Sequence, residues 1–366
     1  MRQTGFRLTS NDRGSMPSTL AYKAILNALH FSGAQTASRY WLRGRGAVLM
    51  LHRTRDPLTG FDPNAHLSVS PGFLDQLLGS LKAQGMRFVA LDDLTQILGS
   101  DFDRDQDPVV AITLDDGYRD NLENAVPVFR KHGAPFTIFV APGLVDGRAT
   151  PWWEDLGLAI ASREHFVLRS PKGNLSFDVS TRSKKASVFN EMLAMLTTDV
   201  SEFDQRRIVA DLCIQCGIDQ EAHRASSIMN WKELVELSRD PLCTLGAHTI
   251  HHYAVARLDE KLALDEMHES ARVIEMETGK PARHFAFPYG YPAAAGERDF
   301  RLAQQAGFET ALTTRHGVLY PAHANHLHAL PRISLNGNFQ AKRYVDTLMS
   351  GLPTRLQNRG RQLNIG

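Results

Sequence analysis

The chain has 366 residues, of which 43% are hydrophobic and 22% are charged, which is ordinary for a globular protein with a large core. Its 41 basic and 40 acidic residues nearly cancel, so there is no electrostatic case for nucleic-acid binding. Three cysteines do not make a disulfide framework. No apolar run approaches the ~20 residues that cross a bilayer, and the first twenty residues lack the apolar core of a signal peptide. We therefore expect a cytoplasmic protein.

The N-terminal segment divides into two parts. Residues 1–18 are rich in Ser, Thr, Asn, Arg and Gly and predict a flexible tail. Residues 19–46 predict a helical lead-in, with apolar residues at helical spacing and Arg39, Arg43 and Arg45 near its end. We expect this lead-in to pack on the rest of the fold. A peripheral contact of residues 20–45 with a membrane surface is the alternative, and it would make the protein membrane-associated.

Short apolar runs then alternate with segments of helical periodicity. Strands are predicted at 47–51, 87–91, 109–114 and 136–141, and helices at 71–84, 92–98 and 121–132. This alternation is typical of parallel strands joined by right-handed crossovers.

Residues 159–226 break the alternation and are interpreted as an insertion. Residues 166–179 predict a hairpin that turns at Lys172, Gly173 and Asn174, and helices follow near 183–196 and 201–216. The insertion would form a lid or one wall of a groove. Cys213 and Cys216 form a C-x-x-C in the second helix, but no second pair accompanies them, so neither a redox nor a metal role is expected.

The alternation resumes after the insertion. Helices are predicted at 231–238, 258–278 and 299–306, strands at 243–246, 284–287 and 310–313, and a last edge strand at 328–334. About seven strand–helix units favour an α/β fold of the (β/α) barrel type over an open doubly wound sheet. Residues 336–366 would form a C-terminal helix or tail.

The stretch 109–118 is the centre of the predicted fold. Six apolar or β-branched residues lead directly into Asp115, Asp116 and Gly117. A continuous apolar run predicts a buried parallel strand, so the two carboxylates would lie at its carboxyl end, where α/β folds place active sites. Gly117 lets the strand break there, so the two aspartates can have separate roles. A helix N-cap is the alternative role of an aspartate at this place.

A pair of histidines follows another short apolar strand. His248 and His252 are four residues apart, which would put both imidazoles on one face of a helical turn. Two histidines and one carboxylate are a common ligand set for a catalytic zinc ion. Asp116 can supply the carboxylate from a neighbouring strand. His251 would point elsewhere and is the weaker candidate ligand.

Two of these segments, Thr113–Gly117 (TLDDG) and His248–His252 (HTIHH), closely resemble motifs of the polysaccharide deacetylases, carbohydrate esterase family 4 with its NodB-homology domain. The segment Phe285–Gly290 (FAFPYG) looks like the third motif of that family, and the resemblance extends over residues 47–335. It implies a distorted (β/α) barrel. It also implies a metal-dependent hydrolase that removes N-acetyl groups from amino sugars in an oligosaccharide or polysaccharide.

The resemblance also implies roles for single residues. Asp115 matches the general base, and Asp116, His248 and His252 match the metal ligands, with zinc as the first choice and cobalt or nickel as substitutes. The backbone N–H of Tyr289 matches the oxyanion donor. His52, at the end of the first strand, resembles the general acid of circularly permuted members.

The chain departs from the family pattern in places. Ala286 stands where the third motif usually has an arginine that orients the base, and Arg332 is the candidate replacement. The Trp-bearing motif is not at its usual place, so Trp152 and Trp153 would line the groove, with simple packing as the alternative. Together with Pro288 and Arg332, these two residues are the predicted substrate-binding set.

Two other functions remain open. The first is a chitooligosaccharide deacetylase of the nodulation-factor type. The second is a non-catalytic carbohydrate-binding protein on a deacetylase scaffold, which the missing arginine favours and the complete Asp-Asp and His-x-x-x-His patterns oppose.

Overall fold

A closed ring of parallel strands is the core of the fold, in a computed structural model that describes residues 18–170 and 173–365. The order around the ring is β1–β12–β11–β10–β9–β6–β5, and β5 pairs again with β1. Seven strands therefore form a distorted barrel, which confirms the predicted α/β fold class. A short eighth strand, β4, pairs with the start of β5. The strands are β1 (Gly46–Leu51), β4 (Arg87–Phe88), β5 (Val109–Leu114), β6 (Phe136–Val140), β9 (Cys243–Ala247), β10 (His284–Ala286), β11 (Thr310–His316) and β12 (Leu330–Ser334).

The register between β1 and β5 fixes the geometry of one barrel edge. The two strands pair without a shift, from Gly46 opposite Val109 to Leu51 opposite Leu114, and every residue of both strands is buried. Gly46 is required at the start, because a Cβ there would lie 1.8 Å from the Val109 carbonyl oxygen. In consequence, the residues that follow the two strands leave the barrel side by side.

Two sequence predictions about strands need correction. The segment predicted as a last edge strand forms β12, which lies inside the ring between β11 and β1, through the pairs Leu312 with Leu330 and Leu49 with Ile333. Of the strand predicted at 87–91, only Arg87 and Phe88 pair, because a 3₁₀ turn begins at Leu91. The partner β1 is remote from β12 in sequence, which local patterns do not encode.

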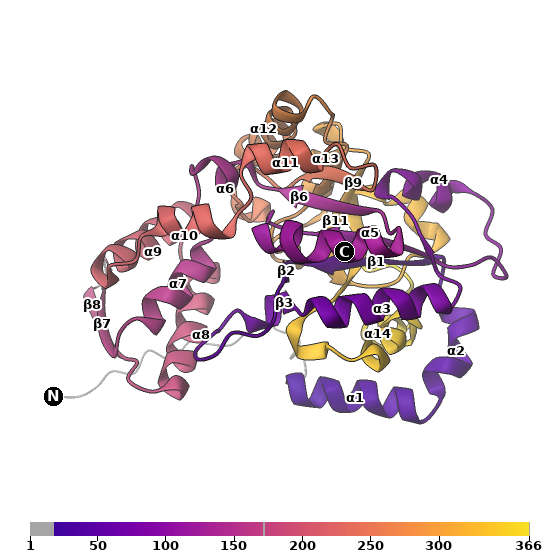
Figure 1. Cartoon of the computed structure of the whole chain (residues 1–366), viewed down its shortest axis with the longest axis horizontal. Helices are drawn as coiled ribbons and strands as arrows, with labels where there is room; N and C mark the ends of the chain where they lie inside the picture. The colour runs from indigo at the N-terminus through magenta and orange to yellow at the C-terminus, as the bar shows by residue number, and fades with distance from the viewer. Residues whose placement is uncertain (1–17, 171–172, 366) are drawn as a thin grey trace.

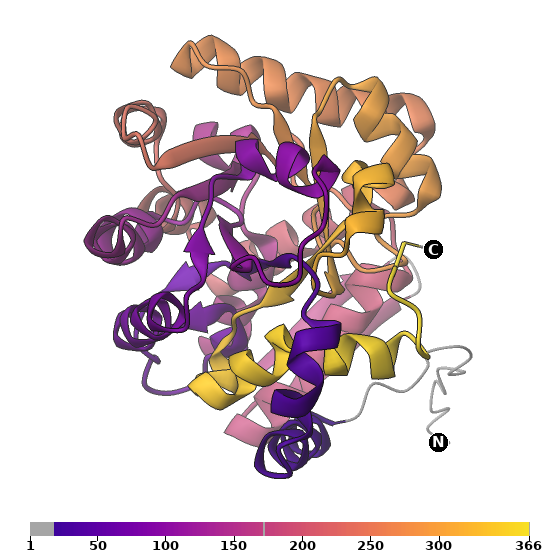
Figure 2. The same ribbon diagram turned by 90° about the vertical axis from the view of Figure 1, so that its right-hand side faces the viewer.

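Helices surround the barrel (Figures 1 and 2). Their ends carry the expected capping residues: Ser70 accepts a hydrogen bond from the N–H of Phe73, and Asn230 and Glu233 form a reciprocal capping box. These helices are α3 (Pro71–Ala83), α4 (Leu94–Gly99), α5 (Val126–His132, preceded by a π turn at Asn121–Ala125), α11 (Trp231–Leu237), α12 (Glu260–Thr278) and α13 (Glu297–Gln305). Short pieces complete the barrel region, namely the parallel pair β2 (Arg53–Thr54) and β3 (Ser68–Val69) and the 3₁₀ turns Ala65–Leu67, Leu91–Asp93, Val255–Arg257, Pro321–Asn325, Leu327–Ala329 and Gly337–Phe339.

The segment between β6 and β9 forms a lobe at the left of Figure 1. Its helices pack around α7, and an antiparallel hairpin pairs His165 with Asp178 through Ser170 with Gly173. Of the predicted turn, Lys172 lies outside the described residues. The lobe consists of α6 (Pro142–Asp146), α7 (Trp152–Ala161), β7 (His165–Ser170), β8 (Gly173–Asp178), α8 (Arg182–Thr198), α9 (Glu202–Cys216) and α10 (Gln220–Ser227).

The two ends of the described chain pack together below the barrel (Figure 2). Helix α1 (Thr19–Phe31) lies on α14 (Lys342–Met349), and α2 (Ala34–Leu42) lies on α15 (Leu352–Gln357). Leu26 is fully buried between them, and Gln357 Nε2 donates to the Tyr22 hydroxyl at 3.1 Å. The predicted tail, apart from Ser18, lies outside the described residues. Among the helices that are described, none has the length and apolarity to span a bilayer.

Candidate active site

The predicted site residues meet at the carboxyl-terminal edge of the barrel. Leu51 of β1 pairs with Leu114 of β5, so His52 and Asp115 emerge next to each other. His248 follows β9 directly, and β10 pairs with the end of β9. The strands β1, β5 and β9 thus deliver an imidazole, two carboxylates and a second imidazole to one place, although β5 and β9 are not neighbours as predicted, because β6 lies between them.

Asp116, His248 and His252 form a buried cluster. The Oδ1 atom of Asp116 lies 3.0 Å from His252 Nε2 and 3.5 Å from His248 Nε2, and the three side chains offer ligand atoms within 4.8 Å of one another. All three residues are at most 5% exposed. Among the described residues, no donor makes a well-aligned hydrogen bond to Asp116 Oδ1. A buried carboxylate oxygen without a donor but facing two imidazole nitrogens is the arrangement that a divalent cation fits.

The protonation of the cluster also suits a metal. His248 Nδ1 lies 2.6 Å from the carbonyl oxygen of Ala286, so this nitrogen carries the proton and Nε2 presents a lone pair towards Asp116. Burial lowers the pKa of His252 to about 4, which keeps its ring neutral. Burial alone would raise the pKa of Asp116, but the adjacent imidazoles, His252 first, hold it well below its usual range. At neutral pH the cluster therefore holds an anionic Asp116 and a neutral His252, which is the form in which both side chains can bind a metal.

The His248–His252 segment is not the helical turn that the spacing predicted. Thr249 and His252 both have a φ of 56°, in the left-handed region, and no helix is formed. The bend is held by Glu266 of α12, whose Oε2 accepts from the N–H groups of Ile250 and His251 at 2.9 Å each. Because one carboxylate binds two successive N–H groups, the loop closes tightly and both ligand imidazoles converge. The His251 ring turns to Glu266 instead, with Nδ1 at 2.6 Å from Oε1.

Backbone strain is concentrated at this edge. Non-glycine residues rarely adopt positive φ, and each such residue costs roughly 1–2 kcal/mol. Of the five that the described chain contains, four belong to the site: Asp116, Thr249, His252 and Tyr289, with φ between 56° and 73°. Strain that persists at one place is typical of a functional centre.

Asp115 is held by Arg332. The guanidinium donates to both carboxylate oxygens, Nη1 to Oδ1 at 2.7 Å and Nη2 to Oδ2 at 2.8 Å. It also donates to Thr113 Oγ1 and to the Thr313 carbonyl, and it is only 1% exposed. Burial alone would raise the pKa of Asp115, but the Arg332 charge outweighs it and holds the pKa below the usual value. Asp115 is thus an ionised, oriented carboxylate next to the cluster.

His52 and Tyr289 complete the edge. His52 Nε2 lies 4.0 Å from Asp115 Oδ2, and its side chain is 21% exposed, far more than that of Asp115. The backbone N–H of Tyr289 has no hydrogen-bond partner among the described residues, whereas its carbonyl accepts from Thr314 Oγ1 at 2.6 Å. A free N–H in a strained turn is suited to binding an anionic oxygen. Pro288, just before it, is buried.

The two tryptophans form a wall behind the cluster. They begin α7 rather than lying in a loop, and they are 1% and 7% exposed. Trp152 Nε1 donates to the Tyr289 hydroxyl at 2.9 Å, and the Trp153 ring centroid lies 4.7 Å from that of His252. Little ring surface is open to a sugar, so this geometry favours the packing alternative.

The sequence did not predict two residues that support the loop of residues 248–252, which we call the ligand loop because it carries the candidate metal ligands. Arg206, on α9 of the lobe, donates from Nη2 to the carbonyls of His252 at 2.8 Å and His251 at 3.2 Å. Its guanidinium lies between the rings of Trp152 and Tyr253. Arg206 and Glu266 lie on helices outside the loop, and a charged residue in an ordinary amphipathic helix gives no signal of such a role.

The lobe is joined to the barrel edge by a second charged network. Arg53, which follows His52, donates to Asp120 Oδ2 at 2.8 Å and to Glu154 Oε2 of α7 at 2.6 Å. Asp155, fully buried, accepts from Gln220 Nε2 and pairs with His223 Nδ1, both at 2.7 Å. These contacts tie α7 and α10 to the strand that carries His52.

Comparison with known proteins gives the class of the molecule. The polysaccharide deacetylase family model matches residues 103–187 and 206–311, more than half of the sequence. The chain therefore belongs to the polysaccharide deacetylase family, as its motifs predicted. The matched residues include Asp115, Asp116, His248, His252 and Tyr289, but neither His52 nor Arg332. No curated protein matches the sequence.

Solved structures show the same fold at low identity. The Streptococcus pyogenes deacetylase PplD, in complex with acetate, is 17% identical with a TM-score of 0.55, and the match covers 82% of this chain and 97% of that one. IcaB from Ammonifex degensii is 19% identical with a TM-score of 0.53, over 83% and 98% of the two chains. BC0361, a polysaccharide deacetylase from Bacillus cereus, is 16% identical with a TM-score of 0.51, over 82% and 68%.

Proposed function

We propose that this polysaccharide deacetylase is a divalent-metal-dependent hydrolase that removes N-acetyl groups from amino sugars in an oligosaccharide or polysaccharide. The observation that carries the proposal is the pairing of two different carboxylates at one edge. Asp116 faces two imidazoles and no hydrogen-bond donor, whereas the adjacent Asp115 is oriented by Arg332.

The metal would be held by Asp116, His248 and His252. Zinc is the first choice for two imidazoles and one carboxylate, with cobalt or nickel as substitutes. When bound, such an ion acidifies a coordinated water and polarises the acetyl oxygen.

The remaining roles fall to the chain's own groups. Asp115, ionised and fixed by Arg332, accepts the proton of the attacking water. The Tyr289 N–H binds the developing oxyanion, and one such donor is worth roughly 2.7–4 kcal/mol. His52, the most exposed of these side chains, donates a proton to the departing amine, without which an amide nitrogen is a poor leaving group.

The two alternatives are separated by different observations. A decayed, non-catalytic scaffold is disfavoured. The third motif has Ala286 where an arginine would orient the base, but Arg332 donates to both oxygens of Asp115 and can take that role. The nodulation-factor type of chitooligosaccharide deacetylase is separated by substrate length. An enzyme of that type would release acetate from short N-acetylglucosamine oligomers, whereas the main proposal also includes release of acetate from polymers.

The test is an acetate-release screen over amino-sugar oligomers and polymers, with and without chelator. We expect release that chelator abolishes and zinc restores. Asp115→Asn should keep the metal and lose nearly all turnover, and His248→Ala should lose metal. His268→Ala is the matched control, since His268 is 61% exposed on α12 and should change neither. An active Asp115→Asn enzyme, or release unaffected by metal removal, would contradict the proposal.

A further inference from the structure

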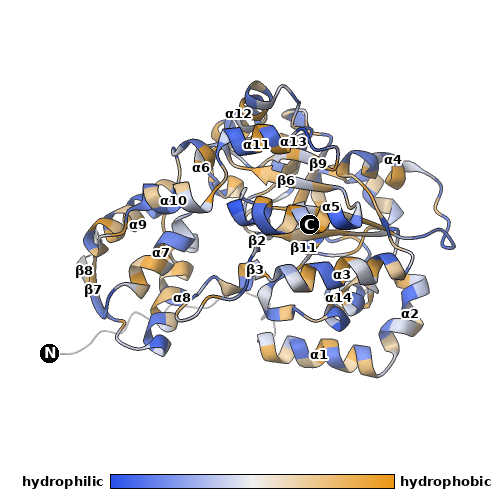
Figure 3. Ribbon diagram, viewed as in Figure 1, coloured by the Kyte–Doolittle hydropathy of each residue, from blue (hydrophilic) through white to orange (hydrophobic). Residues whose placement is uncertain are grey.

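The outer face of α1 is apolar and exposed. Surface helices normally turn charged or polar residues outwards, but every residue on this face is apolar. Leu20 is 80% exposed, Phe31 is 76% exposed and Ile25 is 44% exposed. Figure 3 shows the apolar colouring along α1 at the lower edge of the molecule. We call this surface the α1 face: Leu20, Ala21, Ala24, Ile25, Ala28 and Phe31.

The α1 face is not needed to hold α1 in place. The opposite side of the helix packs on α14, where Leu26 is fully buried and Asn27 Nδ2 lies 3.5 Å from the Tyr344 hydroxyl. Contiguous apolar surfaces are rare on the outside of soluble proteins, and an exposed one usually marks an interaction site.

The helices around this face are strongly basic. Residues 19–45 and 336–365, which form α1, α2, α14, α15 and their connections, contain nine basic residues and one acidic residue, Asp346. The whole chain has a net charge of only +1, so the rest of the molecule is acidic. None of the nine forms an ion pair with a carboxylate of the described residues. They are Lys23, Arg39, Arg43, Arg45, Lys342, Arg343, Arg355, Arg359 and Arg361.

Some of these charges adjoin the α1 face or its apolar surroundings. Lys23 lies over the Phe339 ring at 5.7 Å, and Arg343 Nε donates to Asn27 of α1 at 2.8 Å. A shallow hollow beside α15 is lined by two of the arginines together with apolar side chains, namely Arg355, Arg361, Leu363 and Ile365.

We propose that the α1 face and the basic residues of α1, α14 and α15, namely Lys23, Lys342, Arg343 and Arg355, dock on an anionic membrane surface. An apolar helix face that enters the headgroup region and basic residues that attract anionic lipids are the two signals that stable peripheral binding requires. A second copy of this chain is a poorer occupant, because a symmetric contact would bring two sets of positive charge together. The inference does not rest on the proposed catalytic function.

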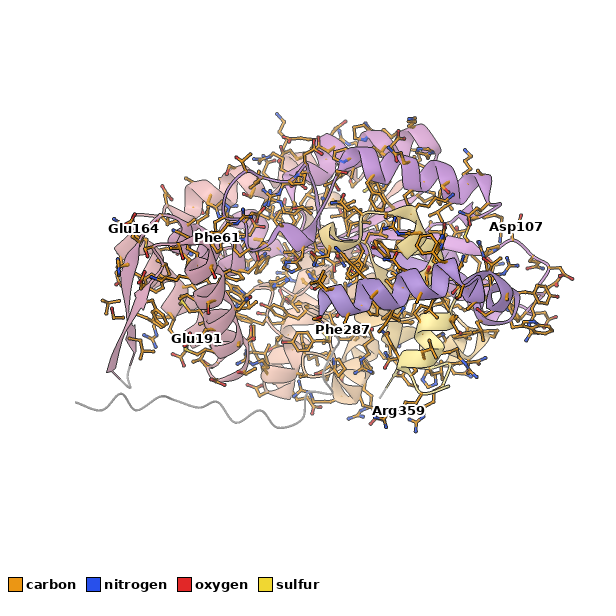
Figure 4. The ribbon with its side chains drawn as sticks, turned by 90° about the horizontal axis from the view of Figure 1, so that it is seen from below. Phe61, Asp107, Glu164, Glu191, Phe287 and Arg359 are labelled. Carbon is orange, nitrogen blue, oxygen red and sulfur yellow. The ribbon has the colours of Figure 1, made fainter. Side chains whose placement is uncertain are left out.

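An acidic loop marks the border of this surface. Residues 101–107 contain four aspartates, and Tyr40 of α2 donates to Asp105 Oδ1 at 3.3 Å. Figure 1 shows this loop at the right of the molecule, beyond α2, and Figure 4 labels Asp107 at the same end in the view from below. Because these aspartates would be repelled by anionic lipids, the proposed membrane contact is assigned to α1, and the outer end of α2 lies outside it.

The experiment is co-sedimentation of the full chain with vesicles of phosphatidylcholine alone or with about 30% phosphatidylglycerol. We expect at least about tenfold stronger binding to the anionic vesicles, weakening as ionic strength rises. Phe31→Glu and Lys342→Glu should each lower the partition coefficient, the second at least about fivefold because it removes one positive charge and adds a negative one. The matched controls are Ile214→Glu, at a position 77% exposed on α9, and Arg239→Glu, at one 70% exposed in the turn after α11.

Two results would overturn the inference. The first is binding without the expected specificity. This means equal binding or no binding to the two kinds of vesicle, or an equal loss of vesicle binding in the control variants. The other is a concentration-dependent dimer, seen by light scattering without vesicles, that Phe31→Glu abolishes, because the face would then belong to a second copy.

Discussion

Replacing Arg332 by methionine tests the most buried ion pair of the site. The guanidinium is 1% exposed and Asp115 is 2% exposed, and the arginine makes four hydrogen bonds at this place. Arg332→Met leaves the Asp115 carboxylate buried without its counterion. Breaking a buried pair by removing one partner costs about 3–5 kcal/mol of stability.

A double-mutant cycle isolates the interaction itself. Asp115→Asn removes the charge from the other side, and the double variant removes both charges. Because the two side chains contact each other directly, the double variant should be more stable than the sum of the single losses predicts, by about 1–3 kcal/mol. Urea unfolding in the presence of chelator measures all four proteins without a contribution from bound metal. Additive losses would show that the pair is not coupled and would refute the reasoning.

The same arginine has a predicted effect on turnover. Arg332→Met should lower kcat while the metal content stays unchanged, because Arg332 contacts Asp115, the proposed base, and none of the proposed ligand side chains. Arg332→Lys should recover part of the activity, since lysine keeps the charge but not the two-point contact. If Arg332→Met retained the full kcat, Arg332 would not be the residue that orients the base.

Further predictions concern the lobe and the outer parts of the barrel. Arg206→Met should weaken metal affinity about 10–100-fold in a chelator competition, because it frees the ligand loop, whereas the exposed neighbouring Arg207→Met should not. The imidazole of His284, whose Nε2 lies 3.5 Å from Asp92 Oδ1, is the main group that lowers the pKa of Asp92 to about 2, so Asp92→Asn should destabilise the protein at pH 7, with the difference fading between about pH 4 and pH 2 in urea unfolding. Burial raises the pKa of Cys213 to about 12, so a thiol reagent at pH 8 should label it only after unfolding; labelling of the native protein would contradict its burial.

Local patterns were sufficient for the elements that carry the site. The strand before Asp115 is an unbroken apolar run, and the helices have clear apolar stripes with capping residues, so local physics and the final fold agree. Arg332 was identified as a candidate only because the third motif has Ala286 in place of an arginine. Its contact with Asp115 spans 217 residues, which no periodicity encodes.

The failures have the same physical origin. The spacing of His248 and His252 correctly grouped the two imidazoles but predicted a helix, because the carboxylate of Glu266 that bends the loop comes from the following helix and lies outside the range of a helical period. Arg206 was missed for the same reason. The strand at 330–334 was placed at an edge because closure of the ring depends on pairing with β1, almost 300 residues earlier.

The four left-handed residues have a consequence for engineering this enzyme. A screen for thermostability would reward glycine at Thr249, because glycine adopts that angle at no steric cost. The gain in melting temperature would come with greater flexibility of the barrel edge that carries the site. The candidate ligand atoms and the free N–H of Tyr289 would then no longer keep one fixed arrangement. Stabilised variants of this chain should therefore be selected outside those positions, and a transplanted site would need to copy the backbone as well as the side chains.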